Sequence, residues 1–316
     1  MLKHIPAPLQ TIYFNLLQQA AYDAPASVFT RNVAGRVYFS AQERHGAVRF
    51  QRQIGPVDDE AAKREAGRLK ARAEAAKNAR KLVSTLRRAG ISAPNPAMGR
   101  VLEVISNAGL FERGAVVLVG TLAYVCYSPA LGMYLPPDLM ATEDIDLSVV
   151  SLAVRQIEPT DLLEILKRAD MTFEPVFNSG HGSKLPSKYR SANTMIVETI
   201  TNLRRSENPV DVPQLKSSAI ALRYQDYLVE EPEKFVALHG AGVPILAPRP
   251  ARYAVHKLII AQERPEQFKR EKDWAQARAL FDAVPRDLID EALDDARSRS
   301  RKWAVLVENG LKLAGL

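Results

Sequence analysis

A short apolar run that ends in glycine and threonine is the feature that most constrains this chain. Residues 116–119 are β-branched or leucine, and such a run predicts a buried strand. Gly120 and Thr121 follow at once, and residues 122–127 are apolar and suit the first turns of a helix. A glycine lets the backbone approach a ligand closely, and a helix N-terminus presents free N–H groups to an anion. The segment therefore predicts a strand, a phosphate-binding turn and a helix.

A second apolar segment carries two acidic side chains. Residues 145–150 predict another buried strand. Because side chains alternate along a strand, Asp144 and Asp146 are expected on one face, with Ile145 and Leu147 on the other. Oxygen ligands suit Mg²⁺, which binds one or two carboxylates together with substrate phosphates. The pair therefore predicts a divalent-cation site that carries a nucleotide, while capping or loop acids are the alternative.

Composition restricts the class of protein. The chain has 316 residues, of which 47% are hydrophobic and 25% charged, as in globular proteins of one large or two medium domains. The net charge of +7 is compatible with a polyanionic substrate such as RNA, DNA or a nucleoside triphosphate, and it is also common in proteins that bind none. The single cysteine, Cys126, excludes an intramolecular disulfide and predicts a buried thiol. Since no signal peptide or membrane span is recognisable, a cytoplasmic protein without membrane contact is expected.

The N-terminal part of the chain predicts a helix, a small β-structure and a long basic helix. Residues 11–22 have helical spacing, residues 28–33 and 36–40 flank a turn at Ala34-Gly35, and residues 48–54 suit a third strand. A helix is then expected from residue 58 to 88. Its basic side chains are Lys63, Arg64, Arg68, Lys70, Arg72, Lys77, Arg80 and Lys81. They form either a rail for a nucleic-acid backbone or an ordinary solvated face.

The remainder of the chain predicts a mixed α/β core followed by helices. Helices are expected at residues 98–108 and 160–168, and strands at 173–177, 195–200, 210–212 and 220–228, with a polar, glycine-rich loop at 178–184. Four further helices are expected at residues 252–262, 265–281, 285–296 and 300–313. This order predicts an α+β protein, with a mixed sheet flanked by helices and a helical cap.

Several segments together carry a resemblance to a known family. They are Gly120-Thr121, Asp144-x-Asp146, the strand around Glu198, the segments 222–228 and 248–258, and Lys272-Asp273. In this combination, over residues 98–281, the chain resembles the nucleotidyltransferase superfamily with its DNA polymerase beta-like fold. It is most similar to a bacterial subgroup of uncharacterised nucleotidyltransferases related to AbiE-type toxins. Together with the order of the elements, the resemblance predicts three regions, namely an N-terminal helix, hairpin and basic helix (1–95), a nucleotidyltransferase core (96–245) and a C-terminal helical domain (246–316).

The resemblance also implies roles for the acidic strand and the turn. Gly120 and Thr121 would hold phosphates, and Thr121 alternatively only caps the helix. Asp144 and Asp146 would bind two Mg²⁺ ions, and Glu198 would be a third acid at the metal site. The subgroup more often has aspartate at that third position, and a surface strand residue is the alternative for Glu198. A two-metal site stabilises both the attacking and the leaving oxygen of an in-line displacement.

Cations on the later helices complete the implied site. Lys257 is the residue that would neutralise the phosphates, and Lys272, Asp273, Arg264 and Lys269 would contact triphosphate or substrate. An ordinary helix-surface pair is the alternative for Lys272 and Asp273.

Aromatic and imidazole side chains are assigned more simply. Tyr253 suits core packing better than a base-stacking platform, and His181 and His256 suit structural positions better than metal ligation, since no second histidine lies at ligand spacing.

These roles imply a magnesium-dependent transferase. It would move a nucleoside monophosphate from ATP or another NTP to a hydroxyl of RNA, tRNA, a protein or a small molecule, and release pyrophosphate. The alternatives are a non-catalytic module that binds nucleotide or nucleic acid, and a component of a toxin–antitoxin or phage-defence system on the same fold.

Overall fold

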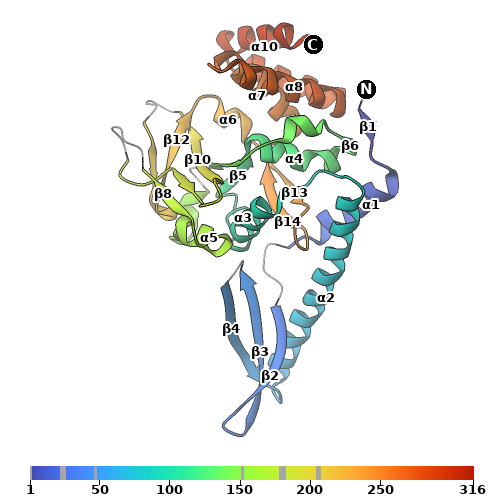
Figure 1. Cartoon of the computed structure of the whole chain (residues 1–316), viewed down its shortest axis with the longest axis vertical. Helices are drawn as coiled ribbons and strands as arrows, with labels where there is room; N and C mark the ends of the chain where they lie inside the picture. The colour runs from blue at the N-terminus through green and yellow to red at the C-terminus, as the bar shows by residue number, and fades with distance from the viewer. Residues whose placement is uncertain (1, 22–25, 46–47, 151–152, 178–182, 204–207) are drawn as a thin grey trace.

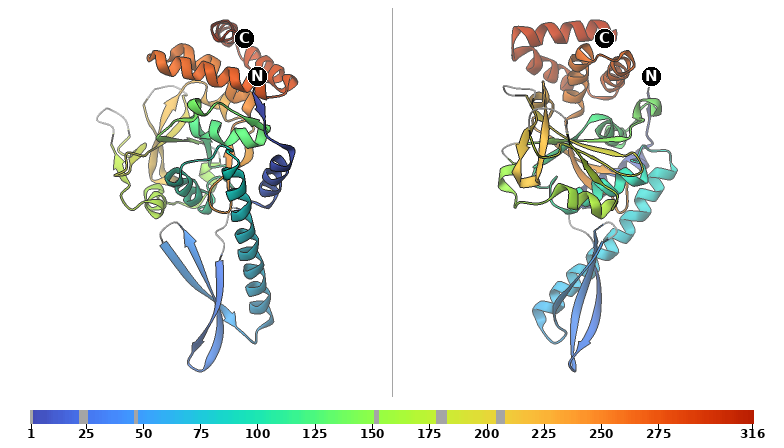
Figure 2. Two further views of the ribbon diagram at one scale, coloured as in Figure 1. Left: turned by 45° about the vertical axis from the view of Figure 1, so that its right-hand side comes forward. Right: turned by 60° about the vertical axis from the view of Figure 1, so that its left-hand side comes forward.

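Three regions follow one another along the long axis of the molecule (Figure 1). The computed structural model describes residues 2–21, 26–45, 48–150, 153–177, 183–203 and 208–316. A β-sheet and part of a long helix project from one end of a mixed α/β core, and a group of helices covers the other end (Figure 2). The predicted glycine-rich loop at 178–184 falls mostly outside the described residues.

A mixed sheet forms the core, as predicted. Its strands are β5 (Val116–Val119), β7 (Asp144–Val149), β8 (Glu174–Val176), β9 (Lys188–Arg190), β10 (Ile196–Asn202), β11 (Val210–Val212) and β12 (Ser217–Leu222). The order is β11-β12-β10-β7-β5, and β8 and β9 extend the sheet beside the first half of β10. β10 runs parallel to β7 and β12, whereas β5 is antiparallel to β7. β10 therefore lies beside β7, the strand that carries Asp144 and Asp146, over most of its length.

Helices cover the sheet, two of them with one apolar face and the third with apolar residues on all sides. They are α3 (Pro96–Asn107), α4 (Gly120–Leu131) and α5 (Leu162–Ala169). The side chain of Asn95 accepts a hydrogen bond from the backbone N–H of Met98 and caps α3. α4 is buried almost throughout, and it contains Cys126, whose thiol pKa is raised to about 12 by burial. The predicted buried thiol is confirmed.

One stretch of the core differs from the prediction. β12 ends at Leu222 and a short helix, α6 (Gln225–Leu228), follows, although residues 220–228 suggested a strand. Tyr224 has φ 62°, a left-handed conformation that ends an extended strand. A hairpin that the sequence did not predict follows, made of β13 (Glu233–Ala237) and β14 (Val243–Ala247).

The predicted N-terminal elements are present. They are α1 (Ala7–Gln19), β2 (Ala26–Val33), β3 (Arg36–His45), β4 (Val48–Pro56) and α2 (Glu60–Arg88), preceded by β1 (Lys3–His4), which pairs with β6 (Met133–Tyr134). Asp59 caps α2 by accepting from two backbone N–H groups. The second half of α2 packs with α1 and β13 through a cluster that includes Leu86, Tyr13 and Val236.

The first half of α2 packs instead on the antiparallel sheet β2-β3-β4, through Leu69 against Ala26 and Ala41. We call residues 26–45 and 48–72 the arm. Figures 1 and 2 show the arm projecting away from the core, opposite to the C-terminal helices.

Four helices form the other end, as predicted. They are α7 (Pro250–Ile260), α8 (Gln267–Ala283), α9 (Arg286–Ser298) and α10 (Arg301–Ala314). Tyr253 of α7 is 1% exposed and packs edge-on against Tyr127 of α4. This burial agrees with core packing and leaves no face of Tyr253 for a base. In the described part of the chain, no helix combines the length and apolar character needed to cross a membrane.

Candidate active site

The turn between β5 and α4 depends on a glycine. Gly120 has φ 68°, and a Cβ atom at this position would lie 2.0 Å from Oδ2 of Asp146. The carboxylate of Asp146 therefore lies directly over the Gly120 backbone, and only a residue without a side chain fits there. The Tyr253 hydroxyl lies 3.1 Å from the carbonyl oxygen of Gly120 and 3.1 Å from Oε1 of Gln276, so it donates to one or the other. The turn is thus held between β7 and α7.

Three predicted acids meet at neighbouring strands. Asp144 and Asp146 lie on β7, and Asp146 pairs in register with Glu198 of the parallel strand β10. Paired residues of adjacent strands project to the same face, so the three carboxylates share one face of the sheet. Asp144 is exposed, whereas Asp146 and Glu198 are partly buried.

The close approach of these acids changes their titration. Burial, together with the nearby charges of Glu198 and Asp144, raises the pKa of Asp146 to about 7. Burial and Glu198 also raise the pKa of Asp144. Within the described residues, the Asp146 carboxylate has no hydrogen-bond or ion-pair partner. Negative charge therefore accumulates here without a full counter-charge, and a proton or a cation would relieve it.

Glu198 differs from the two aspartates because it has a partner. It forms an ion pair with Lys188 of β9, the residue opposite it in the antiparallel pair. In the described residues, no three His, Cys, Asp or Glu side chains are arranged to hold one metal ion. The structure thus brings the three acids to one face without forming a three-ligand set.

The predicted cations form a separate cluster. Lys257 is 5% exposed and forms an ion pair with Asp273, and Nε of Arg264 lies 3.1 Å from Oδ2 of the same aspartate. Burial alone would raise the pKa of Asp273, but Lys257 and Arg264 lower it below its ordinary value. The Lys257 ammonium also lies 5.2 Å from the Tyr253 ring centroid. Two cations thus share one buried carboxylate, and the cluster keeps one positive charge in excess.

Lys272 and Lys269 lie beside this cluster on α8. The ammonium group of Lys272 donates to the carbonyl oxygen of Ala141 at 2.7 Å and so ties α8 to the segment before β7. Burial and the charge of Lys257 lower the pKa of Lys272. Lys269 pairs with Glu266 at 3.0 Å on the helix surface.

A cavity of about 490 Å³ connects the acidic and basic groups. Of the predicted residues, Gly120, Asp146, Lys257 and Arg264 line it, together with Tyr253. Its apolar wall is formed by Ile200, Ile220, Leu222, Leu228 and Ile260. Thr121, Asp144, Glu198, Lys272 and Asp273 lie outside this lining. The cavity has the mixed character of a site for a ligand with a charged and an apolar part.

The cavity also contains residues that the sequence did not indicate. His256 is 5% exposed, and neither ring nitrogen has a hydrogen-bond partner in the described part of the chain. Burial and the charge of Lys257 lower its pKa to about 3, so the ring is neutral. The Tyr224 hydroxyl donates to Glu263 at 2.8 Å on the opposite rim. His256 directly precedes Lys257 and Glu263 follows it by six residues, and neither spacing indicates a ligand.

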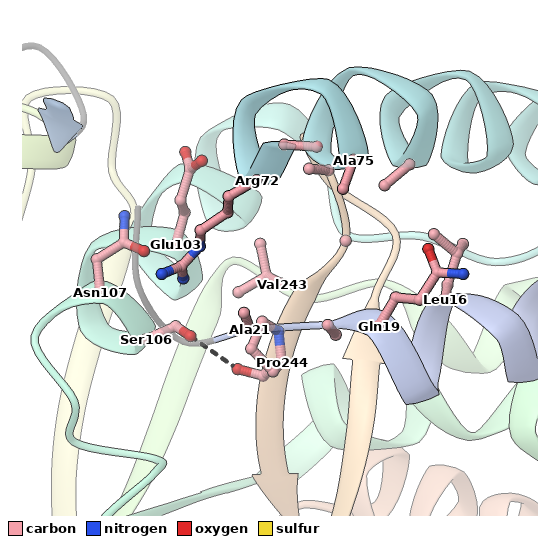
Figure 3. A pocket seen from close by; sticks show the side chains of 15 residues that line it. Leu16, Gln19, Ala21, Arg72, Ala75, Glu103, Ser106, Asn107, Val243 and Pro244 are labelled. Carbon is pink, nitrogen blue, oxygen red and sulfur yellow. Dashed lines mark hydrogen bonds between the residues drawn. The ribbon is translucent and has the colours of Figure 1, made fainter. Parts of the chain in front are cut away.

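A second cavity is smaller and has a different character. It measures about 100 Å³ and lies between α1, α2, α3 and β14 (Figure 3). Ser106 donates a hydrogen bond to the carbonyl oxygen of Pro244 at 2.9 Å, and alanines of α2 form much of the wall. Figure 3 shows Arg72 and Glu103 at its edge. None of the predicted site residues lies there.

The strand, glycine turn and helix, with paired carboxylates on the adjacent strand, are the arrangement of a nucleotide-handling fold. A model of the family described as Nucleotidyltransferase matches residues 96–301, which is well over half of the chain. The chain therefore belongs to this nucleotidyltransferase family. The predicted superfamily and the α+β fold are confirmed, while the relation to AbiE-type toxins stays a prediction.

Two solved structures are distantly similar. The antibiotic-resistance factor ANT(2'')-Ia is 15% identical, with 64% of this chain and 92% of that chain covered at a TM-score of 0.38. An antigenic nucleotidyltransferase-like protein from Paracoccidioides brasiliensis is 16% identical, with 69% of this chain and 94% of that chain covered at a TM-score of 0.35. No curated protein sequence matches the chain.

Proposed function

We propose that this chain transfers a nucleoside monophosphate from an NTP to a hydroxyl group and releases pyrophosphate. The observation that carries the proposal is the position of Asp146. Its carboxylate is partly buried without a partner in the described residues, lies against the Gly120 turn, and lines one cavity with Lys257 and Arg264. Negative, phosphate-binding and positive groups thus surround one space, as phosphoryl transfer requires.

The acidic strand fits a magnesium ion. Asp144 and Asp146 offer only oxygen donors, and Asp146 lacks the counter-charge that would stabilise its ionised form. Two carboxylates suffice for an ion that keeps water and takes phosphate oxygens as further ligands. Bound there, Mg²⁺ would supply Lewis-acid stabilisation of the charge on the phosphates. Glu198 would join as a third ligand once it leaves Lys188.

The remaining residues bind and orient the nucleotide. The first N–H groups of α4, at Gly120 and Thr121, point to the phosphates, since they begin a helix. Arg264, whose side chain is 42% exposed, would turn toward the phosphates on leaving Asp273, whereas Lys257 acts from a buried position beside Asp273. Lys272 supports the site by holding α8 to the segment before β7. The nucleotide base would pack against the apolar wall of the cavity.

The acceptor is proposed only by class, as a hydroxyl of RNA, a protein or a small molecule. Cytoplasmic location and three regions along the chain are retained as predictions from the sequence, and a toxin–antitoxin or phage-defence role as a prediction from the resemblance.

The test is label transfer. Purified chain is incubated with each α-³²P-labelled NTP, Mg²⁺, total RNA and protein lysate. Label should enter one acceptor class with the native chain and the Glu143→Gln control, and not with Asp144→Asn/Asp146→Asn. Glu143 is a suitable control because it is an exposed acid one residue from the pair. Transfer that persists in the double variant would overturn the proposed site, and NTP binding without any transfer would favour a non-catalytic nucleotide-binding module.

A further inference from the structure

The positive charge of the chain is concentrated in one region. Residues 26–88 contain fifteen Lys and Arg against six Asp and Glu, and this surplus of nine exceeds the +7 of the whole chain. Most of these residues belong to the arm. The rest of the chain, which includes the cavity, therefore has a slightly negative net charge. The positive charge that suggested a polyanionic partner lies within residues 26–88.

Only one face of the arm sheet is covered. Val28, Ala41 and Ile54 pack against Leu69 of α2, so alternate residues of each strand point to the other side. The register places Phe29 beside Ser40 and Arg31 beside Tyr38 on that side, which we call the open face. A hydrogen bond of 3.0 Å between the side chains of Gln51 and Gln42 supports this assignment.

The open face combines aromatic and basic side chains. Phe29, 38% exposed, lies diagonal to Tyr38, and Arg31 stands directly opposite Tyr38. At the other end of the face, Arg44 and Arg49 are exposed and pair in register.

Acidic residues are placed away from the open face. Among its described positions there is no Asp or Glu, because Glu43 lies on the covered side in register with Phe50. Asp58, at the tip of the arm, pairs with Arg36 at 3.2 Å.

We propose that the open face of the arm binds a single-stranded polynucleotide. Exposed arginines would contact the phosphates, and the two rings would stack on bases. The glutamines between them would hydrogen-bond to base edges, which are accessible only when the strand is unpaired. A protein partner would need acidic patches to complement the arginines. This binding does not depend on the proposed transfer reaction, since the arm and helix α7, whose residues line the cavity, lie at opposite ends of the core (Figure 2).

The test measures binding of fluorescein-labelled U15 and dT15 by the full-length chain without NTP. An open-face variant, Arg31→Gln/Arg44→Gln/Arg49→Gln, is compared with a helix-face variant, Arg64→Gln/Lys77→Gln/Lys81→Gln. Both remove three exposed charges between residues 26 and 88. Circular dichroism melts establish that both variants fold. Tighter binding of U15 would identify RNA as the source of the strand, and tighter binding of dT15 would identify DNA.

The open-face variant should bind at least tenfold more weakly, and the slope of log Kd against log salt should fall by about 2. The helix-face variant should lose less than threefold. Phe29→Ala should weaken binding about tenfold with the same salt slope, and Phe29→Trp should restore it.

Two results would overturn the proposal. One is an equal loss in both triple variants, which would indicate non-specific attraction of a polyanion. The other is binding to phosphatidylglycerol vesicles without binding to either oligonucleotide. Asp144→Asn/Asp146→Asn should bind both oligonucleotides like the native chain, so a failure of the transferase proposal would not affect this test.

Discussion

The acidic and basic groups near the cavity differ in how well their charges are compensated. On the carboxylate side, Asp144 and Asp146 lie beside Glu198, and the pKa values of both aspartates are raised. On the cation side, Lys257 and Arg264 share the buried Asp273, whose pKa is lowered. Repulsion between carboxylates therefore dominates on the first side, whereas attraction between the cations and Asp273 dominates on the second.

This difference separates function from stability. A group of like charges reduces stability, so its presence points to a ligand that neutralises it. A satisfied buried ion pair needs no ligand, and removing one partner leaves an uncompensated charge. Substitutions on the carboxylate side should therefore reduce transfer more than stability, and substitutions on the cation side should reduce stability.

Asp146→Asn should have the largest effect. Transfer should fall by about 10³-fold or more, because the amide cannot supply the negative charge for a cation, and this corresponds to about 4 kcal/mol of transition-state stabilisation. The midpoint of thermal unfolding should stay equal or rise, since one repelling charge is lost. Single-turnover label transfer and calorimetry measure the two quantities. A loss of stability without a loss of transfer would reverse the assignment of the two sides.

Lys257→Met should destabilise the protein by about 3–5 kcal/mol, because Asp273 is 4% exposed and would keep its charge without its main partner. Urea unfolding measures the change. The double variant Lys257→Met/Asp273→Leu should recover most of it, since both buried charges are gone. A double variant as unstable as the single one would show that packing, and not charge, explains the loss.

Gly120→Ala tests the contact between the turn and Asp146. It should cost about 2–4 kcal/mol, because a left-handed backbone is strained by a side chain and the new Cβ would meet Oδ2 of Asp146. Gly35→Ala is the matched control: it has φ 80° and nothing within 4 Å of its Cβ position, so only backbone strain of about 1 kcal/mol is expected. Adding Asp146→Ala to Gly120→Ala should reduce its cost toward that of the control.

The smallest effect concerns pH. The pKa of His256 is lowered from 6.5 to about 3, so the unfolded chain takes up its proton first and stability falls as pH decreases below about 6.5. Asp146, with its raised pKa, acts in the opposite direction between about pH 7 and 4. The comparison is therefore made in an Asp146→Asn background. Between pH 7 and 5.5, the free energy of unfolding should fall by about 1 kcal/mol more in the protein with His256 than in the His256→Phe variant. Equal pH profiles would show that His256 is charged in the folded state.

The turn and the acidic strand were predictable because their signals are local. The run at residues 116–119, Gly120 and the alternation of Asp144 and Asp146 each occur within a few residues and follow the geometry of a strand. The same holds for the arm hairpin at Ala34-Gly35 and for the C-terminal helices, whose spacing fixes their buried faces.

The partners across the sheet were not predictable. Lys188 reaches Glu198 only because the short strand β9, which has no clear pattern, pairs beside it. The hairpin β13–β14 was missed because Pro244 and few alternating residues conceal its strands. Lys272 was predicted to contact nucleotide, yet it donates to Ala141, a carbonyl that no spacing in the sequence connects to it.

Through the hydroxyl of Tyr253, the C-terminal helices support the glycine turn of the site. A chain truncated after Ala247 would keep every strand of the main sheet but lose the group that lies 3.1 Å from the Gly120 carbonyl oxygen. The N-terminal end of α4 and the glycine turn would then lose this support, and the apolar surface of Tyr127 and Tyr124 would face water. Gene fusions and domain exchanges that end at the last strand would therefore separate the sheet from the helix that holds its turn in place.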